Sequence, residues 1–152
     1  MPKIVIPKVL VGWNVVVVED DPDNQMVAQM MLERAGATVF IAENGQDGLE
    51  MIRKHLPNFV LSDISMPVMD GWALIKHLNE DRRTSDIPVI ALTAHAMYGD
   101  REKALRAGFT NYLSKPLDPA KFTFQLLTLL VEIPQYTEQL KAHYDTLKLQ
   151  QN

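Results

Sequence analysis

Cysteine is absent from the 152 residues of this chain. Disulfide frameworks, thiolate metal sites and cysteine nucleophiles are therefore excluded, and nothing supports an oxidising compartment. We accordingly expect a cytoplasmic protein. A chain of this length, 47% hydrophobic and 22% charged, is expected to form one domain with a real core rather than two.

Long apolar runs and an excess of positive charge are also missing. The longest apolar stretch centres on residues 15–18, far short of the roughly 20 residues that span a bilayer, so we expect no membrane insertion. Pro2, Pro7 and Lys8 interrupt the only candidate signal peptide, which we interpret as an extension that could form an edge strand. The net charge of −4 argues against nucleic-acid binding.

Apolar runs of four to six residues alternate along the chain with stretches of helical periodicity. This alternation is typical of a parallel sheet that helices cover on both faces. We therefore predict an α/β fold, doubly wound around a five-stranded parallel sheet, over residues 13–131. Residues 1–12 are assigned to the N-terminal extension and residues 132–152 to a helical C-terminal tail. The expected strands are 14–19, 37–42, 58–62, 88–92 and 111–114.

The first expected helix has clear start and stop signals. Asp21 is a candidate N-cap, Pro22 fits the first helical position, and Gly36 marks the end. Its amphipathic stripe is predicted from residues at helical spacing, namely Met26, Val27, Met30, Met31 and Arg34.

Charged and hydroxyl side chains follow the expected strands where they end. Glu19 and Asp20 follow the first strand, Asp63 the third, Thr93 the fourth and Lys115 the fifth. Ligands of an open doubly wound sheet bind beyond the carboxyl ends of its strands, so we expect these side chains to share one crevice. Three carboxylates so close together repel one another unless a cation joins them, and hard oxygen ligands suit Mg²⁺.

Lys115 and Thr93 complete a site for an anion. The Lys115 ammonium can reach Asp63 or an anion bound there, and the Lys115–Pro116 bond is a candidate for the cis form. A metal, an ammonium, a hydroxyl and a carboxylate nucleophile are the parts that stabilise a transferring phosphoryl group. The sequence has no glycine-rich phosphate loop, so a nucleotide is not the expected ligand.

Four segments, all at strand ends, carry a family resemblance. They are VVVVEDDPDN from residue 15, LSDISMPVMDG from residue 61, ALTAHAM from residue 91 and LSKPL from residue 113. In this order and spacing they resemble the receiver domain of two-component response regulators, over residues 13–131. The resemblance implies a flavodoxin-like sheet with the strand order 2-1-3-4-5.

The resemblance assigns the acidic residues of the crevice. Asp63 would be the phosphoacceptor. Glu19 and Asp20 would bind Mg²⁺ or Mn²⁺ together with Asp63 and the backbone carbonyl of Ser65. The protein would thus be a signalling phosphoacceptor and no enzyme in the ordinary sense, since it would catalyse only its own phosphorylation and dephosphorylation.

Other positions would respond to the phosphoryl group. Lys115 would pair with its oxygens, and Thr93 would turn to bond them. Tyr112 matches the switch aromatic of the family, whose ring turns inward when Thr93 moves and alters the face made by the fourth helix, fifth strand and fifth helix. Ser65 and His95 occupy positions where the family varies and which affect the lifetime of the phosphate.

The resemblance also implies partners. The phosphoryl group would come from a phosphohistidine on a histidine kinase or a phosphotransfer protein. About 20 residues follow position 131, too few for a DNA-binding output domain, so we expect a single-domain regulator of the chemotaxis or phosphorelay kind. Its output would be a downstream target protein.

The tail supports two hypotheses. Its apolar residues recur at helical spacing, so that it can pack on its own domain. Alternatively, a 3-4 rhythm would suit a homodimer contact. The residues of this rhythm are Ile133, Tyr136, Leu140, His143 and Leu147.

Three other functions fit parts of the pattern. A haloacid-dehalogenase-type phosphatase would carry a second Asp two residues after its nucleophile, where this chain has Ser65. A flavodoxin-like FMN protein would surround its phosphate with hydroxyl-rich and glycine-rich loops instead of acids. The serious alternative is a phosphorylation-independent interaction module with the receiver fold, although the intact set of site residues argues against it.

Overall fold

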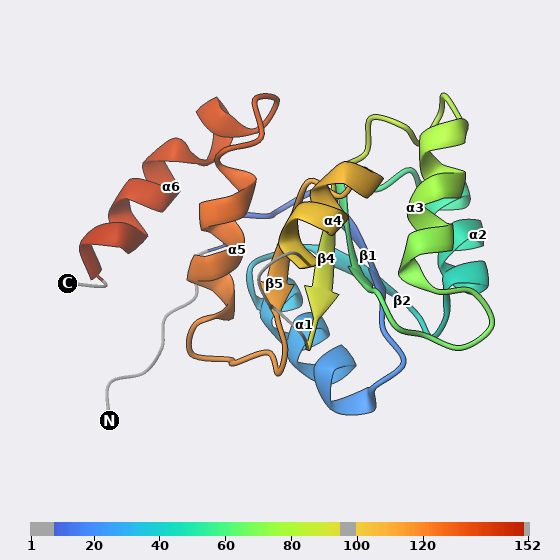
Figure 1. Ribbon diagram of the computed structural model, residues 1–152. Coiled ribbons are helices and arrows are strands. Elements are labelled where there is room, and N and C mark those ends of the chain that lie inside the picture. Colours follow the sequence, from blue (N-terminus) through green and yellow to red (C-terminus); the bar gives the residue numbers. More distant parts are fainter. Residues whose placement is uncertain (1–7, 95–99, 151–152) are drawn as a thin grey trace.

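The computed structural model describes residues 8–94 and 100–150 of the chain (Figure 1). Strands and helices alternate along it, as the sequence predicts, and one further helix follows at the C-terminal end. The elements are β1 (Asn14–Val18), α1 (Pro22–Arg34), β2 (Thr38–Ala42), α2 (Gly45–His55), β3 (Phe59–Asp63), α3 (Gly71–Glu80), β4 (Val89–Thr93), α4 (Asp100–Ala107), β5 (Asn111–Ser114), α5 (Phe122–Leu130) and α6 (Thr137–Gln150).

The five strands form one parallel sheet in the order β2-β1-β3-β4-β5. This confirms the predicted doubly wound fold and strand order. The register pairs Val18 with Ser62 and Asp63 with Leu92, so the carboxyl ends of β1, β3 and β4 lie at one edge of the sheet. Every connection between these parallel strands passes through a helix, which is how such a sheet keeps both faces covered.

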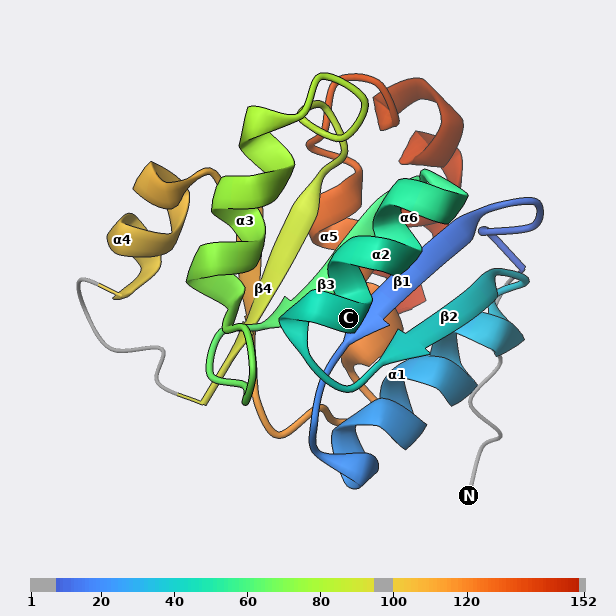
Figure 2. The same ribbon diagram turned by 90° about the vertical axis from the view of Figure 1, so that its right-hand side faces the viewer.

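Two apolar layers pack against opposite faces of the sheet. Val15 and Val17 of β1 join the core under α1 and α5, whereas Val16 and Val18 join the core under α2, α3 and α4. Figure 2 shows this division, with α2 and α3 in front of the sheet and α5 behind it. Successive side chains of a strand point to opposite faces of the sheet. Because helices cover both faces, all four valines are fully buried.

The helix boundaries follow the capping signals of the sequence. Asp21 caps α1, where its carboxylate accepts a hydrogen bond from the Asp23 N–H at 3.0 Å. Pro22 is the first helical residue. Gly36 takes the left-handed conformation after the helix, with φ of 101°, which glycine adopts without strain.

The predicted apolar stripe of α1 is wrong in part. Met26 is 60% exposed, and Met31 alone of the predicted stripe is buried. The buried face instead contains the polar Asn24, because hydrogen bonds satisfy its side-chain amide there. The buried residues of the helix are Asn24, Ala28, Met31 and Leu32.

The described part of the N-terminal extension forms turns instead of an edge strand. Leu10 is buried, and its N–H donates to the Ala35 carbonyl at 2.8 Å. Residues 8–12 therefore pack over the end of α1. The remainder of the extension, residues 1–7, lies outside the described residues.

The tail packs on its own domain, which confirms the first hypothesis for it. The ring of Tyr136 lies 4.5 Å from that of Trp13, and its hydroxyl donates to the Asn58 carbonyl. Leu140 is fully buried, and Tyr144 stacks on Phe124 of α5. Figure 1 shows α6 beside α5, on the side away from the sheet. Of the 3-4 rhythm, Ile133, Tyr136, Leu140 and Leu147 are buried within the chain, and His143 is exposed.

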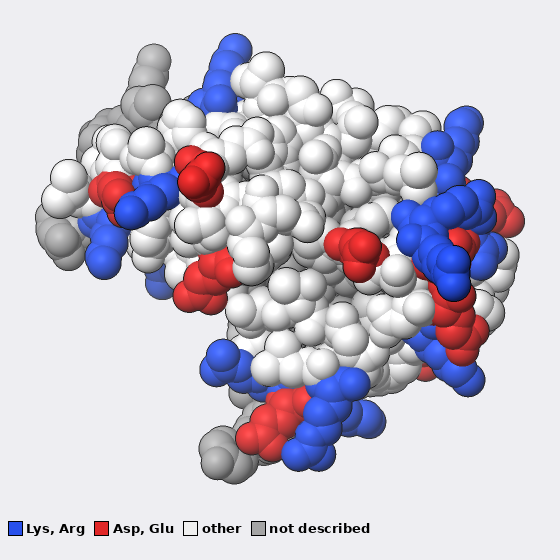
Figure 3. All heavy atoms as spheres, turned by 90° about the horizontal axis from the view of Figure 1, so that it is seen from above, with Lys and Arg blue, Asp and Glu red and all other residues white. Residues whose placement is uncertain are grey.

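Charged side chains are unevenly spread over the end of the molecule where α3 finishes and α6 begins (Figure 1). Figure 3 shows Lys, Arg, Asp and Glu in separate groups toward the rim of this face, one of them on the side where α2 and α3 lie, with a mostly uncharged surface between the groups. Part of the group beside α2 and α3 is an ion-pair network in which Asp81 contacts Arg83 at 3.0 Å and Arg53 at 3.7 Å. Within residues 8–94 and 100–150, no helix has the length and apolarity to cross a membrane.

Candidate functional site

The residues predicted from the strand ends gather at one edge of the sheet. Asp63 and Thr93 are the last residues of β3 and β4, and Glu19 and Lys115 directly follow β1 and β5. They lie at or beside a pocket of about 370 Å³. Its lining residues are Asp20, Asp63, Ile64, Ser65, Trp72, Thr93, Ala94, Lys103 and Lys115.

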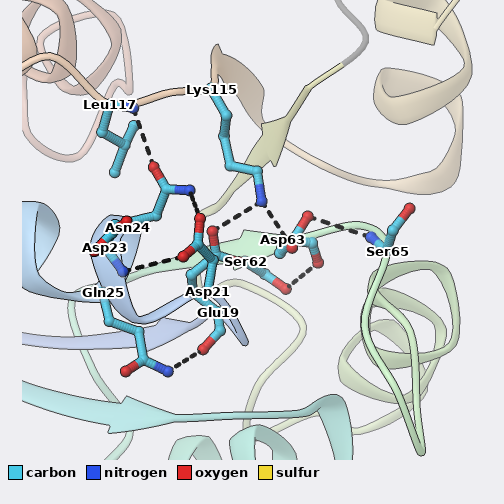
Figure 4. A network of polar contacts seen from close by, with 10 residues as sticks. All are labelled: Glu19, Asp21, Asp23, Asn24, Gln25, Ser62, Asp63, Ser65, Lys115 and Leu117. Atoms are coloured by element: carbon cyan, nitrogen blue, oxygen red, sulfur yellow. Dashed lines mark hydrogen bonds and ion pairs between the residues drawn. The ribbon is translucent and has the colours of Figure 1, made fainter.

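Lys115 joins the two buried carboxylates of this site. Its Nζ lies 2.8 Å from Glu19 Oε1 and 2.9 Å from Asp63 Oδ2, and only 13% of its side chain is exposed (Figure 4). The Lys115 N–H donates to the Thr93 carbonyl at 2.8 Å, and the Lys115–Pro116 bond is cis, as the sequence suggested. The ammonium thus reaches Asp63, as the sequence predicted, and also Glu19.

Three carboxylates form a cluster that fits a divalent cation. Oxygen atoms of Glu19, Asp20 and Asp63 all lie within 4.8 Å of one another. Glu19 Oε2 is buried and has no hydrogen-bond partner in the described part of the chain. A buried carboxylate oxygen without a partner is costly, and coordination of a hard cation such as Mg²⁺ would satisfy it. The donor set is therefore one that Mg²⁺ can use.

Burial and the neighbouring charges shift the pKa values of Glu19 and Asp63 in opposite directions. Burial raises the pKa of Glu19 from 4.5 to about 8, and Asp63 adds to the increase while Lys115 opposes it. Burial would also raise the pKa of Asp63, but the neighbouring Glu19 carboxyl and the Lys115 ammonium favour its charged form, so that its pKa falls below 3.8. At neutral pH, Asp63 is thus the ionised carboxylate that a nucleophile must be.

The loop after Asp63 folds back tightly onto the strand end. The Ser65 N–H donates to Asp63 Oδ1 at 3.3 Å, and the Gly71 N–H donates to the Ile64 carbonyl at 2.8 Å. A Cβ at Gly71 would lie 2.4 Å from the Asp63 carbonyl oxygen, so only glycine permits this approach. The loop therefore keeps Ser65 at the rim of the pocket.

Asn24 is a positioning residue that the sequence did not reveal. Its Nδ2 donates to Asp21 Oδ2 at 2.7 Å, and its Oδ1 accepts from the Leu117 N–H at 3.1 Å. Figure 4 shows these bonds linking the acidic loop after β1 to the segment that follows Lys115. A polar residue in the first turn of a helix usually faces solvent, so its spacing alone gave no signal.

Thr93 and Tyr112 occupy different hollows. Thr93 is half-buried and lines the pocket of Asp63. Tyr112 is also half-buried, but it lines a second hollow, between β5 and α5, and its ring lies 5.6 Å from the guanidinium carbon of Arg101. His95 lies outside the described residues.

Trp72 and Lys103 also line the pocket of Asp63 without having been predicted. Trp72 lies in the first turn of α3, and Lys103 in α4. No strand ends near either residue in the sequence. The other site residues were predicted from their places at strand ends, so that criterion could not identify these two.

Comparison with protein families agrees with this geometry. Residues 15–126 match the family described as the response regulator receiver domain. The polar-differentiation response regulator DivK of Brucella anthropi is 36% identical over 109 residues, which cover 72% of this chain and 89% of DivK. An uncharacterised 14.6 kDa protein of Leptolyngbya boryana is 44% identical over 110 residues, which cover 72% of this chain and 84% of that protein.

Solved structures share the fold. The receiver domain of the sensor histidine kinase PA1611 from Pseudomonas aeruginosa, which has a magnesium ion coordinated in its active-site cleft, matches with a TM-score of 0.70 and 33% identity, over 78% of this chain and 98% of that domain. The chemotaxis response regulator CheY4 of Vibrio cholerae matches with a TM-score of 0.71 and 28% identity, over the same shares of the two chains.

Proposed function

The chain belongs to the family of response regulator receiver domains, and we propose that it accepts a phosphoryl group on Asp63 in two-component signalling. The observation that carries this proposal is the contact of Lys115 with both Asp63 and Glu19 at the carboxyl edge of the sheet. Such an arrangement offers an ionised carboxylate as nucleophile and a cation for the oxygens of the incoming group.

The transfer needs little besides positioning and charge. An oxygen of Asp63 attacks phosphorus, and the bond from phosphorus to the leaving group of the donor breaks with its electron pair. The Lys115 ammonium then pairs with a phosphoryl oxygen instead of the two carboxylates, and the Thr93 hydroxyl donates to another. Ala94, beside Thr93 on the pocket wall, leaves room for the phosphoryl group.

Glu19, Asp20 and Asp63, with the backbone carbonyl of Ser65, would hold Mg²⁺ or Mn²⁺. The ion would supply positive charge to the phosphoryl oxygens during transfer. Its fit rests on the carboxylate cluster and on the unsatisfied Glu19 Oε2. Because Glu19 must lose its proton to become a ligand, binding of the ion and ionisation of Glu19 are coupled.

Phosphorylation of Asp63 is a small electrostatic change that would alter the shape of a protein-binding face. Thr93 moves toward the phosphoryl group, and Tyr112 turns inward from its half-buried position, which remodels the face made by α4, β5 and α5. The phosphoryl donor would be a phosphohistidine on a histidine kinase or a phosphotransfer protein, and the changed face would bind a downstream target.

Intact mass spectrometry tests the proposal. The protein is incubated with acetyl phosphate in the presence of Mg²⁺ and, in parallel, of a chelator. We expect one added phosphoryl group with Mg²⁺ and none with the chelator. Absence of the adduct under both conditions would favour the alternative, a phosphorylation-independent interaction module with the receiver fold.

A further inference from the structure

The pocket of Asp63 has a second wall, built from helices on one face of the sheet. Trp72 of α3 and Lys103 of α4 both line it. Lys103 Nζ lies 4.8 Å from the centroid of the Trp72 ring, within the range of a cation–π contact. This wall carries a positive charge that the proposed transfer at Asp63 leaves without a role.

The Trp72 ring is itself held in place. Its ring lies 5.8 Å from that of Phe109 in an edge-to-face arrangement, and Phe109 is buried in the core under α3 and α4. Among the described side chains, no carboxylate lies within ion-pair distance of Lys103. The indole therefore keeps an exposed ammonium at the pocket without neutralising it.

The transfer places a second anionic group in this pocket when the donor is an acyl phosphate. Asp63 must attack in line with the departing oxygen, so the leaving group lies on the side of phosphorus away from Asp63. As the bond from phosphorus to that oxygen breaks, negative charge collects on a carboxylate. Lys115 contacts Asp63 and serves the transferred group, whereas Lys103 is a separate cation in the same pocket that can face the departing one.

We propose that Lys103, held over Trp72, binds the leaving carboxylate of small acyl phosphates. This proposal rests on the proposed function of Asp63. In the step concerned, the bond from an Asp63 oxygen to phosphorus forms, the bond from phosphorus to the acyl oxygen breaks, and the carboxylate leaves with the electron pair. No proton transfer is needed, and Lys103 stabilises the charge of the product carboxylate.

The experiment compares two phosphoryl donors on four proteins. The proteins are the wild type, Lys103→Met, Lys103→Arg and the control Lys141→Met, which removes an exposed charge on α6. The donors, each with Mg²⁺, are acetyl phosphate, whose leaving group is a carboxylate, and phosphoramidate, whose leaving group is ammonia. The initial slope of the phosphorylation rate against donor concentration is measured by intact mass.

Lys103→Met is expected to lower the slope for acetyl phosphate about fivefold, the upper end for an exposed ion pair, and to leave the slope for phosphoramidate nearly unchanged. Lys103→Arg keeps most of the wild-type slope, and Lys141→Met keeps all of it. Equal losses with both donors, or no loss with either, would overturn the subsite while leaving the phosphoacceptor in place. If neither donor labels the wild type, the proposed function itself fails.

Discussion

Lys115 Nζ lies 2.9 Å from Asp63 Oδ2, although 52 positions separate the two residues in the sequence. The same ammonium lies 2.8 Å from Glu19 Oε1. The ammonium therefore supplies positive charge to these two carboxyl groups, as a bound divalent cation would. A cation bound by Glu19 and Asp63 must compete with Lys115, and a phosphoryl group on Asp63 must recruit it.

Replacement of Lys115 should separate metal binding from phosphorylation. In Lys115→Met, the affinity for Mg²⁺ should rise, because the competing ammonium is gone and the Asp63 carboxylate is left without a cation. The rate of phosphorylation by acetyl phosphate should fall at least about tenfold, since the phosphoryl oxygens lose a charged partner. Calorimetric titration with Mg²⁺ and intact mass spectrometry measure the two quantities, with Lys141→Met as the control. A weaker affinity for Mg²⁺ in this variant would contradict the competition between Lys115 and the metal ion.

The affinity for Mg²⁺ should depend on pH through Glu19. Burial raises the pKa of Glu19 to about 8, so the carboxyl keeps its proton at neutral pH and must release it when the ion binds. The affinity should therefore fall as the pH drops below about 8, approaching a tenfold loss per pH unit. Titrations between pH 6 and 9 measure this slope, which should be shallower in Glu19→Gln.

The same groups give the metal-free protein opposite dependences of stability on pH. The pKa of Glu19 is higher in the folded state than its ordinary 4.5, so the free energy of unfolding should decrease as the pH rises from there to about 8. The pKa of Asp63 is lower in the folded state, so its contribution is present above 3.8 and is lost as the pH falls further. Urea denaturation across this range in Glu19→Gln, which removes the first dependence, separates the two.

Asn24 should matter for stability despite its position in the first turn of a surface helix. In Asn24→Ala, the Leu117 N–H and Asp21 both lose a hydrogen-bond partner near the pocket, which should lower the free energy of unfolding by about 1–3 kcal/mol. Gln29→Ala removes a half-buried side chain of the same helix whose amide bonds Glu33 on the surface. It should change the free energy of unfolding by less than about 0.5 kcal/mol. Equal effects of the two changes would show that the link to Leu117 contributes nothing.

Two leucines of α6 provide a matched test of the tail. Leu140 is fully buried and Leu149 is 75% exposed. Leu140→Ala should lower the free energy of unfolding by about 2–5 kcal/mol, and Leu149→Ala should leave it within about 0.5 kcal/mol.

Sedimentation of a chain ending at Val131 addresses the homodimer hypothesis, which predicts that this truncation shifts the balance from dimer to monomer. The apolar residues of the tail already pack within one chain, so we expect no shift in this equilibrium.

The sheet could be predicted because parallel strands buried on both faces are continuous apolar runs. Val15 to Val18 form such a run, and the capping residues Asp21 and Gly36 fix the ends of the helix that follows. The buried face of that helix could not be predicted from apolar spacing. Asn24 is buried through hydrogen bonds and Met26 is exposed, and hydropathy alone reverses both.

The site could be predicted where backbone topology alone places its residues. Glu19, Asp63 and Lys115 lie at carboxyl ends of parallel strands, and these ends must meet. Trp72 and Lys103 reach the same pocket from helices, so their positions depend on how α3 and α4 pack on the sheet. The tail is a similar case, because only the tertiary contact of Tyr136 with Trp13 distinguishes packing on the domain from pairing with a second chain.

Peptide mapping after incubation with acetyl phosphate and Mg²⁺ tests the central claim most directly. Three proteins are compared: the wild type, Asp63→Asn, and Asp70→Asn, which alters an exposed carboxyl in the same loop and keeps a residue able to cap α3. We predict a single phosphoryl group on Asp63 in the wild type and in Asp70→Asn, and none in Asp63→Asn. A phosphoryl group on any other residue of the wild type, or retained labelling of Asp63→Asn, would contradict the assignment of Asp63 as phosphoacceptor.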